Sequence, residues 1–300
     1  MVLYLTFLTL VISQLLLARG LGGRMPRILM WVGVVTSLFV MHFVAINETG
    51  FLRMILLCNV LLAGMKWVVY REWTLDTGKK LSWCRWWMFS ALWFGMEPSC
   101  FVGKCREVEW RSHAVVGALC VLGGILGVWL CCVWQVENIV ILFVAISMGF
   151  HFGMLRLLTA FWRMLGFPVR TLFRNPLVMK GFRDFWGMRW NLAYSQMMAR
   201  AVKKPLTPIV GEKWSVFAVF VASGLLHELA ITVPVQGGYG WPTLFFVING
   251  IITVFEKEKS WRMGLCCGIL LVMGLPYLFG EKFVEEIIIP SRDVFEYLTL

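Results

Sequence analysis

The sequence has few charged residues, and acidic residues are the scarcest of these. Only 17 of its 300 residues are Asp or Glu, and charged side chains of both signs make up 15% of the chain. A domain that folds in water needs a larger polar surface, so this composition excludes a soluble globular domain. The hydrophobic content of 59% and the mean hydropathy of +0.76 instead indicate an integral membrane protein.

The motifs of several large enzyme classes are also missing. The chain has no GxSxG elbow, P-loop, GxGxxG fingerprint or HExxH pair, so hydrolase, nucleotide-hydrolase, dinucleotide-binding and zinc-protease functions have no support. Its nine cysteines are odd in number and lie mostly inside apolar runs, which indicates small buried side chains. Neither a disulfide framework nor a zinc spacing is present. We expect no metal site.

Long apolar runs are what the sequence does contain, and they define the fold class. A bilayer needs about 20 apolar residues per spanning helix. We therefore predict an all-α, polytopic membrane protein, with residues 1–300 forming a single domain and an additional interfacial or re-entrant helix within 71–113. We expect about eight spans, at about 1–18, 28–46, 51–70, 114–134, 138–155, 214–232, 239–255 and 261–279.

Lysine and arginine occur only in alternate connections between these runs. The first, third and fifth connections carry 3, 7 and 11 basic residues, and the seventh carries 3 when Arg262, just inside the last span, is counted with it; the turns NETG, QVEN and VPVQGGYG carry none. Because cytoplasmic loops carry the excess of basic residues, this pattern predicts that the odd connections are cytoplasmic and that both termini lie on the opposite side. The net charge of +11 is then mainly a topological signal, and nucleic acid is not an expected partner.

The fifth connection, 156–213, contains the first unusual segment, GFRDFWGMRWN. Between Pro176 and Pro205, aromatic residues recur every four positions, which predicts one helix with an aromatic face lying in the cytoplasmic interface. A simple membrane anchor would have the same composition. The aromatic positions are Phe182, Trp186, Trp190 and Tyr194.

The second unusual segment is SGLLHEL, which puts His227 inside the apolar run 214–232. Thirteen residues after Trp214, this histidine is about 20 Å along a helix, so it lies at hydrocarbon depth, where a polar group is costly. Both a structural role and a functional role explain it. Ser223 lies one turn earlier on the same face, and Glu228 points about 100° away, where we expect a basic or backbone partner on another helix. We expect structural roles for His42, His113 and His151.

These two segments resemble those of a known family. DFWGMRWN and SGLLHEL are similar to the DFWGRRWN and SGLMHE segments of plant members of the wax synthase branch of the membrane-bound O-acyltransferases. The resemblance implies an O-acyltransferase that moves an acyl group from acyl-CoA to the hydroxyl of a lipophilic alcohol, forming a wax-type ester. It implies that His227 is catalytic and that Asn191 is functionally important. Met188 departs from the pattern, because plant wax synthases commonly have arginine there.

The same resemblance implies the remaining site residues. Substrate binding is expected from the motif, and coenzyme A phosphates are expected to meet basic residues of the fifth connection, with Ser223 and Glu228 in support. Asp184 is expected to form an ion pair or a helix cap rather than to act as an acid. The substrate-binding residues are then Asp184, Phe185, Trp186, Arg189, Trp190, Arg200, Lys203 and Lys204.

The reaction needs acyl-CoA as co-substrate and no other cofactor. Its partners would be acyl-CoA, a lipophilic alcohol and the lipid bilayer, in the endoplasmic reticulum if the organism is eukaryotic or in the inner membrane if it is bacterial. Two alternatives remain open: a sterol or terpenoid alcohol as acceptor, and a transporter or lipid-binding membrane protein without enzymatic activity. Transporters often contain internal repeats, and none is found in this sequence.

Overall fold

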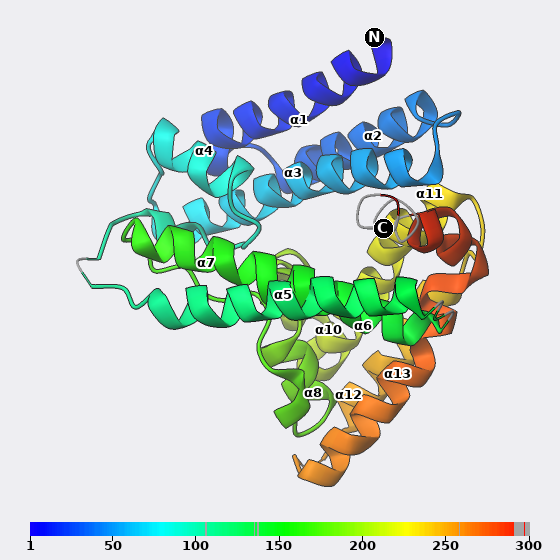
Figure 1. The fold of residues 1–300 in the computed structure, drawn as a ribbon. Helices are drawn as coiled ribbons and strands as arrows, with labels where there is room; N and C mark the ends of the chain where they lie inside the picture. The colour runs from blue at the N-terminus through cyan, green and yellow to red at the C-terminus, as the bar shows by residue number, and fades with distance from the viewer. Residues whose placement is uncertain (106, 135, 137, 258, 291–296, 298–300) are drawn as a thin grey trace.

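The computed structural model is built from helices. It describes residues 1–105, 107–134, 136, 138–257, 259–290 and 297, and within these residues no strand occurs (Figure 1). Seven helical runs are long and apolar enough to cross a membrane, and an eighth, α12, is apolar but shorter. The predicted all-α, multi-pass membrane architecture is therefore confirmed.

The predicted spans correspond one by one to these elements. Their lengths differ from the prediction in both directions. The expected span 239–255 is the 15-residue helix α12 (Trp241–Phe255), short of the about 20 residues that a bilayer requires. Several other runs are longer than expected, above all the 44-residue run Leu192–Val235 in place of the span 214–232. Several of the other runs contain short π-helical turns. In chain order the other runs are α1 (Val2–Leu21), α2 (Arg27–Val44), α3 (Gly50–Thr77), α5 (Arg111–Val133), α6–η3–α7 (Ile139–Ser147, Met148–Met154, Leu155–Met164), α9–η6–α10–η7–α11 (Leu192–Met198, Ala199–Lys203, Lys204–His227, Glu228–Thr232, Val233–Val235) and α13–η8 (Trp261–Phe283, Val284–Ile288).

The first three spans pack together with α4 (Trp83–Ala91), which fills the place of the expected interfacial or re-entrant helix (Figure 1). Ser82 caps α4, because its hydroxyl accepts a hydrogen bond from the Arg85 amide. At the other end of α4 the ammonium of Lys66, from α3, is fully buried. It donates to the carbonyl oxygens of Phe89, Trp93 and Gly95 at 2.6 to 2.8 Å. This contact fastens α4 to the spanning bundle.

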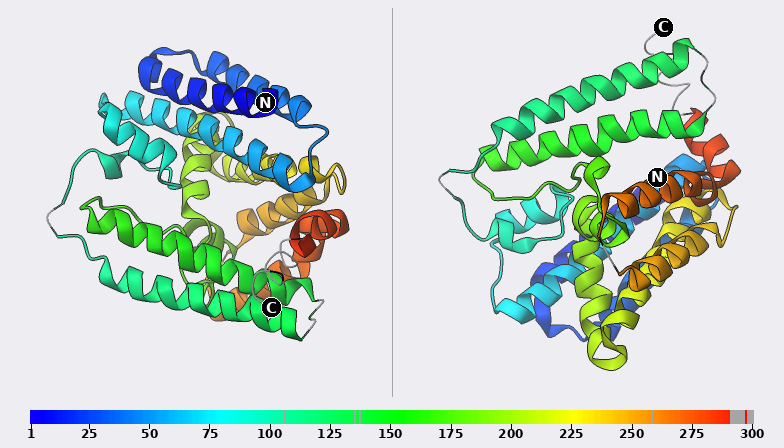
Figure 2. Two further views of the ribbon diagram at one scale, coloured as in Figure 1. Left: turned by 45° about the horizontal axis from the view of Figure 1, so that its top comes forward. Right: turned by 90° about the horizontal axis from the view of Figure 1, so that it is seen from below.

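The sixth run is a helical hairpin rather than one straight rod. Gly211 has φ 80° and ψ 171°, a conformation that glycine adopts without strain, and the chain reverses direction there (Figure 2). The Thr207 hydroxyl donates to Ser215 Oγ at 3.0 Å across the bend. Tyr194 is 17 residues before Gly211 and His227 is 16 residues after it, so the two arms bring these side chains to the same level.

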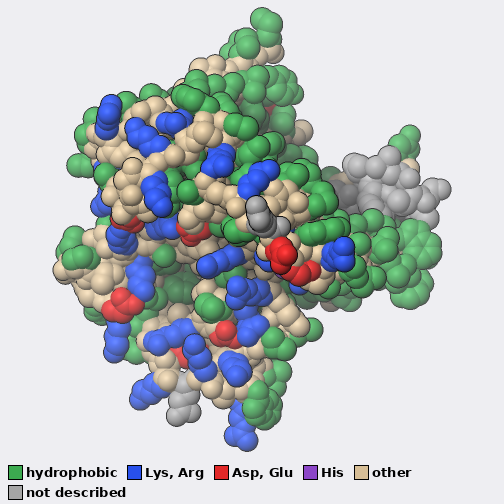
Figure 3. Space-filling view, turned by 90° about the vertical axis from the view of Figure 1, so that its left-hand side faces the viewer, with side chains coloured by type: hydrophobic (Ala, Val, Ile, Leu, Met, Phe, Trp, Pro, Cys, Tyr) green, Lys and Arg blue, Asp and Glu red, His purple; other side chains and the backbone are tan. Residues whose placement is uncertain are grey.

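The basic connections meet at one end of the bundle. Arg27 pairs with Glu72 at 2.9 Å, Lys204 with Asp76, and the Ser260 amide donates to the Lys180 carbonyl at 3.1 Å, so all four odd connections are neighbours. Figure 3 shows Lys and Arg side chains gathered over this end. Two of the connections without basic residues, NETG and the one after α11, lie together at the other end, where Gly50 at the start of α3 meets Val235 of α11. We call these the basic end and the opposite end; the predicted assignment of the basic end to the cytoplasm stays a prediction.

Candidate functional site

The motif GFRDFWGMRWN is a broken segment, so the prediction of one continuous helix between the two prolines is wrong. It consists of α8 (Phe182–Asp184), a π-helical turn, η5 (Phe185–Arg189), and an extended Trp190. Asn191 then adopts the left-handed conformation, with φ 42°. Asparagine tolerates this conformation better than most residues. The break turns the chain at Asn191 and starts α9 there.

Helix α12 determines where the motif lies. The Glu256 carboxylate, at the end of α12, accepts hydrogen bonds from the amides of Phe182 and Arg183 at 2.8 and 2.9 Å. Two turns further into the bundle, the Trp186 indole donates to Asn249 Oδ1 at 3.1 Å. The motif thus descends along α12 from the basic end toward the middle of the bundle. Its aromatic side chains pack against neighbouring helices, and its predicted position in the cytoplasmic interface stays a prediction.

Asp184 and Arg189 form the outer part of the motif. The Asp184 carboxylate accepts from Arg189 Nε at 2.6 Å and from the Lys180 amide at 2.9 Å. Burial raises the pKa of Asp184, but the hydrogen bonds from Arg189 and Lys180 outweigh it, so the pKa lies below the ordinary value. Arg189 also donates to the Asn175 carbonyl at 3.0 Å. Asp184 thus forms the ion pair that was one of its two expected roles and caps no helix that the structure describes, and the two side chains hold the loop before the motif.

The aromatic residues of the motif form a wall. The rings of Phe185 and Trp190 stack with centroids 5.5 Å apart, and Phe173 meets Trp190 edge-on at 5.1 Å. Trp186 packs on Phe246 of α12 at 5.3 Å. Phe185, Trp186 and Trp190 all line one large cavity.

His227 and the residues around it form the polar part of this cavity wall. His227 Nδ1 lies 2.7 Å from the Ser223 carbonyl oxygen. A carbonyl only accepts hydrogen bonds, so in the neutral imidazole Nδ1 carries the proton and Nε2 keeps a lone pair. The ring packs against Phe246 at 4.2 Å and Tyr194 at 5.5 Å. No hydrogen bond joins Nε2 to any described residue, and His227 lines the cavity.

Asn191 reaches the same cavity from the other arm of the hairpin. Its Oδ1 accepts a hydrogen bond from the Tyr194 amide at 3.2 Å and thereby caps α9. This bond fixes the orientation of the side-chain amide. Its NH₂ group has no acceptor among the described residues and lines the cavity with Tyr194. The hairpin therefore brings a free base nitrogen and a free amide donor to one wall.

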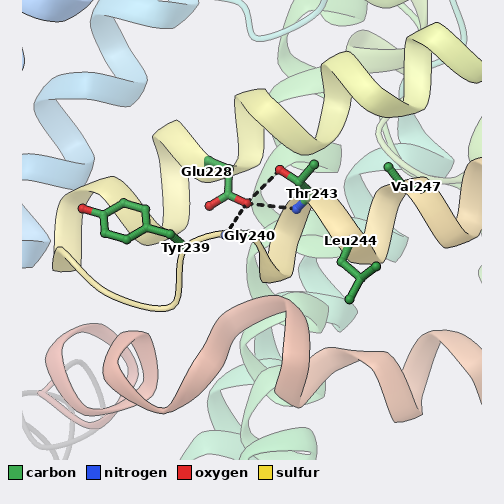
Figure 4. Close-up of a pocket in the computed structure, with 6 residues that line it drawn as sticks. All are labelled: Glu228, Tyr239, Gly240, Thr243, Leu244 and Val247. Carbon is green, nitrogen blue, oxygen red and sulfur yellow. Dashed lines mark hydrogen bonds between the residues drawn. The ribbon is translucent and has the colours of Figure 1, made fainter.

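Glu228 points away from this cavity, as expected, and binds another helix. Figure 4 shows its carboxylate directed at the start of α12, where it accepts from the amides of Gly240 and Thr243 at 3.0 Å and from the Thr243 hydroxyl at 2.8 Å. It lines a separate pocket of about 520 Å³ with Tyr239 and Leu244. Carboxylates favour helix N-termini, so Glu228 anchors α12 beside His227.

The cavity has a volume of about 2100 Å³ and a mostly apolar lining. Toward the basic end it is lined by Lys180, Lys203 and Lys213. Lys203 pairs with Glu212 at 2.6 Å, whereas no acidic side chain in the described part of the chain pairs with Lys180 or Lys213. The other three basic residues expected at the substrate lie outside the lining, as does Asp184. Arg189 pairs with Asp184, Arg200 with Glu97 and Lys204 with Asp76.

Several residues of the site were missed in the sequence. His151 and Arg156, on η3 and α7, line the cavity, although the sequence alone predicted a structural role for His151. Asn249 and Glu256 orient the motif from α12, more than sixty residues away. A polar residue in an apolar run was the only available signal for His151, Arg156 and Asn249, and it does not reveal which cavity a side chain faces.

Residues 169–248, which contain both segments, match the Membrane bound O-acyl transferase family. Probable long-chain-alcohol O-fatty-acyltransferase 2 of Arabidopsis thaliana is 27% identical over 142 residues, 41% of each chain. The long-chain-alcohol O-fatty-acyltransferase of Simmondsia chinensis is 30% identical over 101 residues, 31% of this chain and 29% of the relative. Acyl-CoA--sterol O-acyltransferase 1 of Arabidopsis thaliana is 34% identical over 92 residues, 28% of this chain and 27% of the relative. The chain thus matches less than half of each relative's length, and the resemblance seen in the two segments is confirmed.

Proposed function

We propose that this protein transfers an acyl group from acyl-CoA to the hydroxyl of a lipophilic alcohol and forms a wax-type ester. One observation carries the proposal: His227 Nε2 and the Asn191 NH₂ group, both without a protein partner in the described residues, line the same apolar cavity. Acyl transfer needs a base for the attacking hydroxyl and a donor for the carbonyl oxygen. The family match of residues 169–248 supports the same reaction class.

The chemistry follows from the two free groups. His227 Nε2 takes the hydroxyl proton while the alcohol oxygen attacks the thioester carbonyl carbon. The Ser223 carbonyl, bonded to Nδ1–H at 2.7 Å, stabilises the imidazolium, and the Asn191 NH₂ donates to the carbonyl oxygen as its negative charge develops. The C–O bond forms and the C–S bond breaks. The proton on Nε2 then passes to the leaving sulfur, which releases ester and free coenzyme A.

The polar end of the donor would lie at the basic end of the cavity. Coenzyme A carries phosphates, and lysine ammonium groups bind phosphates as point charges. Lys180, Lys203 and Lys213 line the cavity there. We therefore assign the phosphate contacts to these three lysines, of which only Lys203 was expected from the sequence. The proposal assigns no step to a metal or a redox group.

The acceptor would enter from the membrane. Leu265, Ile269 and Met273 of α13 line the cavity and are also exposed on the outside of the bundle, where lipid would lie. A cavity of about 2100 Å³ has room for a long chain as well as a ring system. The names of the relatives include both long-chain-alcohol and sterol O-acyltransferases. We take a long-chain alcohol as the first acceptor and a sterol or terpenoid alcohol as the second. The expected location is the endoplasmic reticulum, or the inner membrane in a bacterium.

The test is a transfer assay with the purified protein in lipid nanodiscs. Radiolabelled palmitoyl-CoA is supplied with hexadecanol, a sterol, a terpenoid alcohol or diacylglycerol, and labelled ester is measured. We expect ester with hexadecanol at a rate well above that without alcohol. A folded protein that forms no ester with any alcohol would disprove the proposed function. Movement of a labelled lipid across sealed proteoliposomes, without ester formation, would support the transporter alternative instead.

A further inference from the structure

The π-helical turn η3 has two distinct faces. Gly149 and Gly153 pack against α5 so closely that backbone touches backbone. A Cβ atom on Gly124 of α5 would lie 2.4 Å from Gly149 Cα, and one on Gly153 would lie 2.8 Å from the Val121 nitrogen. One face of η3 is therefore fixed against α5, and side chains two positions away, about 200° around the helix, point in the opposite direction.

That opposite face carries polar side chains and lines the large cavity. Ser147, His151 and Arg156 all belong to the cavity lining. In an α-helix a spacing of five residues would turn Arg156 about 140° away from His151. The π-helical turn, with its i to i+5 hydrogen bonds, brings residues five apart onto one face. We call these three residues the polar stripe.

The polar stripe has no partner in the described part of the protein. Ser147 Oγ, His151 Nδ1 and Arg156 Nε are each buried without a hydrogen bond. Buried polar groups are normally satisfied, so three unsatisfied groups on one cavity wall indicate a missing ligand. The imidazole of His151 is nevertheless held in place, because its ring packs on Phe173 at 4.6 Å and on Trp190 at 5.7 Å.

We propose that the polar stripe binds the pantetheine arm and nearest phosphate of the acyl-CoA donor; this inference rests on the proposed function. Ser147 and Arg156 are nine residues apart, about 13 Å along a helix. The single hydroxyl of a long-chain alcohol cannot satisfy groups spread over that length, whereas the arm carries two amides and a phosphate in series. Arg156 lies nearest the basic end and meets the phosphate. His151 packs on Trp190, the neighbour of Asn191, so the deeper end of the arm places the thioester beside Asn191.

The test measures binding rather than turnover. Three unreactive palmityl thioethers are compared as probes: one of coenzyme A, one of pantetheine without phosphate, and one of ethanethiol without the arm. His151→Phe keeps the ring size and removes the nitrogens, and Arg156→Gln removes the charge. His42→Phe is the matched control, because His42 also lies in a span with an unpaired Nδ1 but does not line the cavity.

We expect His151→Phe to weaken binding of the coenzyme A and pantetheine probes about tenfold, the usual effect of one hydrogen bond in a buried site. Binding of the ethanethiol probe should stay unchanged, and His151→Gln should recover part of the loss. Arg156→Gln should weaken only the coenzyme A probe, and less so at high salt. His42→Phe should change none of them.

Two results would overturn the inference: an equal loss for all three probes, or wild-type affinity of His151→Phe for both arm-bearing probes. An equal loss would mean that the cavity itself is damaged. A wild-type protein that binds the coenzyme A probe but esterifies no alcohol would disprove the proposed function and leave the polar stripe standing. A wild-type protein that binds none of the probes would disprove both.

Discussion

Lys66 and His227 each place a nitrogen-containing side chain among apolar helices. They differ in whether every side-chain nitrogen has a hydrogen-bond partner. Lys66 is fully buried, and its ammonium donates three hydrogen bonds to carbonyl oxygens. His227 uses Nδ1 for a bond to the Ser223 carbonyl and leaves Nε2 without a partner at the cavity wall. A polar group in such surroundings is costly unless it is satisfied. Complete satisfaction therefore indicates a structural role at Lys66, and the free nitrogen indicates a chemical role at His227.

The largest effect is expected from His227→Ala. If Nε2 is the base, turnover should fall about 10²- to 10⁴-fold, while affinity for acyl-CoA and the melting temperature change little. Steady-state rates and thermal unfolding of the purified variant check this. Near-wild-type transfer by a normally folded variant would remove the contrast with Lys66, and a loss that only follows the amount of folded protein would make both residues structural.

Asn191→Asp separates the two tasks of Asn191. The aspartate retains the oxygen that caps α9 but lacks the NH₂ group, so turnover should fall about 10²- to 10³-fold, as for a lost oxyanion donor, with little change in stability. Asn191→Ala removes the cap as well and should lower the melting temperature in addition. Comparable turnover of Asn191→Asp and wild type would leave Asn191 with its capping role alone.

Lys66→Met should act on stability. The substitution preserves the length of the side chain but leaves three carbonyl groups without their charged donor, which should lower the free energy of unfolding by about 3 kcal/mol. The remaining folded protein should turn over at the wild-type rate per molecule. Denaturant unfolding in detergent and an activity assay normalised to folded protein measure the two quantities, and a specific loss of activity at unchanged stability would contradict the structural assignment.

The lysines at the cavity are expected to have a smaller effect. Changing Lys180 and Lys213 together to Ala should raise the Michaelis constant for acyl-CoA several-fold and weaken its dependence on salt, because phosphate contacts are lost. The paired change of Arg200 and Lys204 to Ala is the matched control, since these residues lie outside the cavity lining. If the Michaelis constant increased more in the control than in the test variant, Arg200 and Lys204 would be the phosphate contacts, as expected from the sequence.

The smallest effect concerns Asp184. Its pKa is below the ordinary aspartate value, so the charged form is favoured in the folded protein. Its stabilising contribution is then fully present above the unfolded pKa and is lost as pH falls through the lower folded pKa. Asp184→Asn should therefore be less stable than wild type at neutral pH, and the difference should shrink in acid. A melting-temperature difference that does not vary with pH would rule out the ion pair with Arg189 as its cause.

The spanning helices were predictable because length and hydropathy alone determine them. The predicted end of the last span, at about 279, lies one residue before Gly280, where α13 breaks. The path of the motif was not predictable in this way. Its aromatic spacing of four fits a helix. The break at Asn191 depends on a cap and on hydrogen bonds that the motif donates to Asn249 and Glu256, which lie far away in the sequence.

His227 and Asn191 were found through their resemblance to known segments, whereas His151 and Arg156 belong to no such segment. Their convergence on the cavity depends on the π-helical turn η3. A π-helix differs from an α-helix by less than one residue per turn. Hydrophobic periodicity over so short a stretch does not distinguish the two geometries. The polar stripe could therefore be recognised only in three dimensions.

The hairpin at Gly211 makes the geometry of the site sensitive to insertions and deletions in either arm. Because Tyr194 and His227 lie 17 and 16 residues from the bend, their meeting depends on two arms of matched length. Deleting one residue from a single arm would turn everything beyond it by about 100° and shift it by about 1.5 Å, so that His227 would face lipid or another helix. Natural length variation should therefore be rare between Asn191 and Glu228.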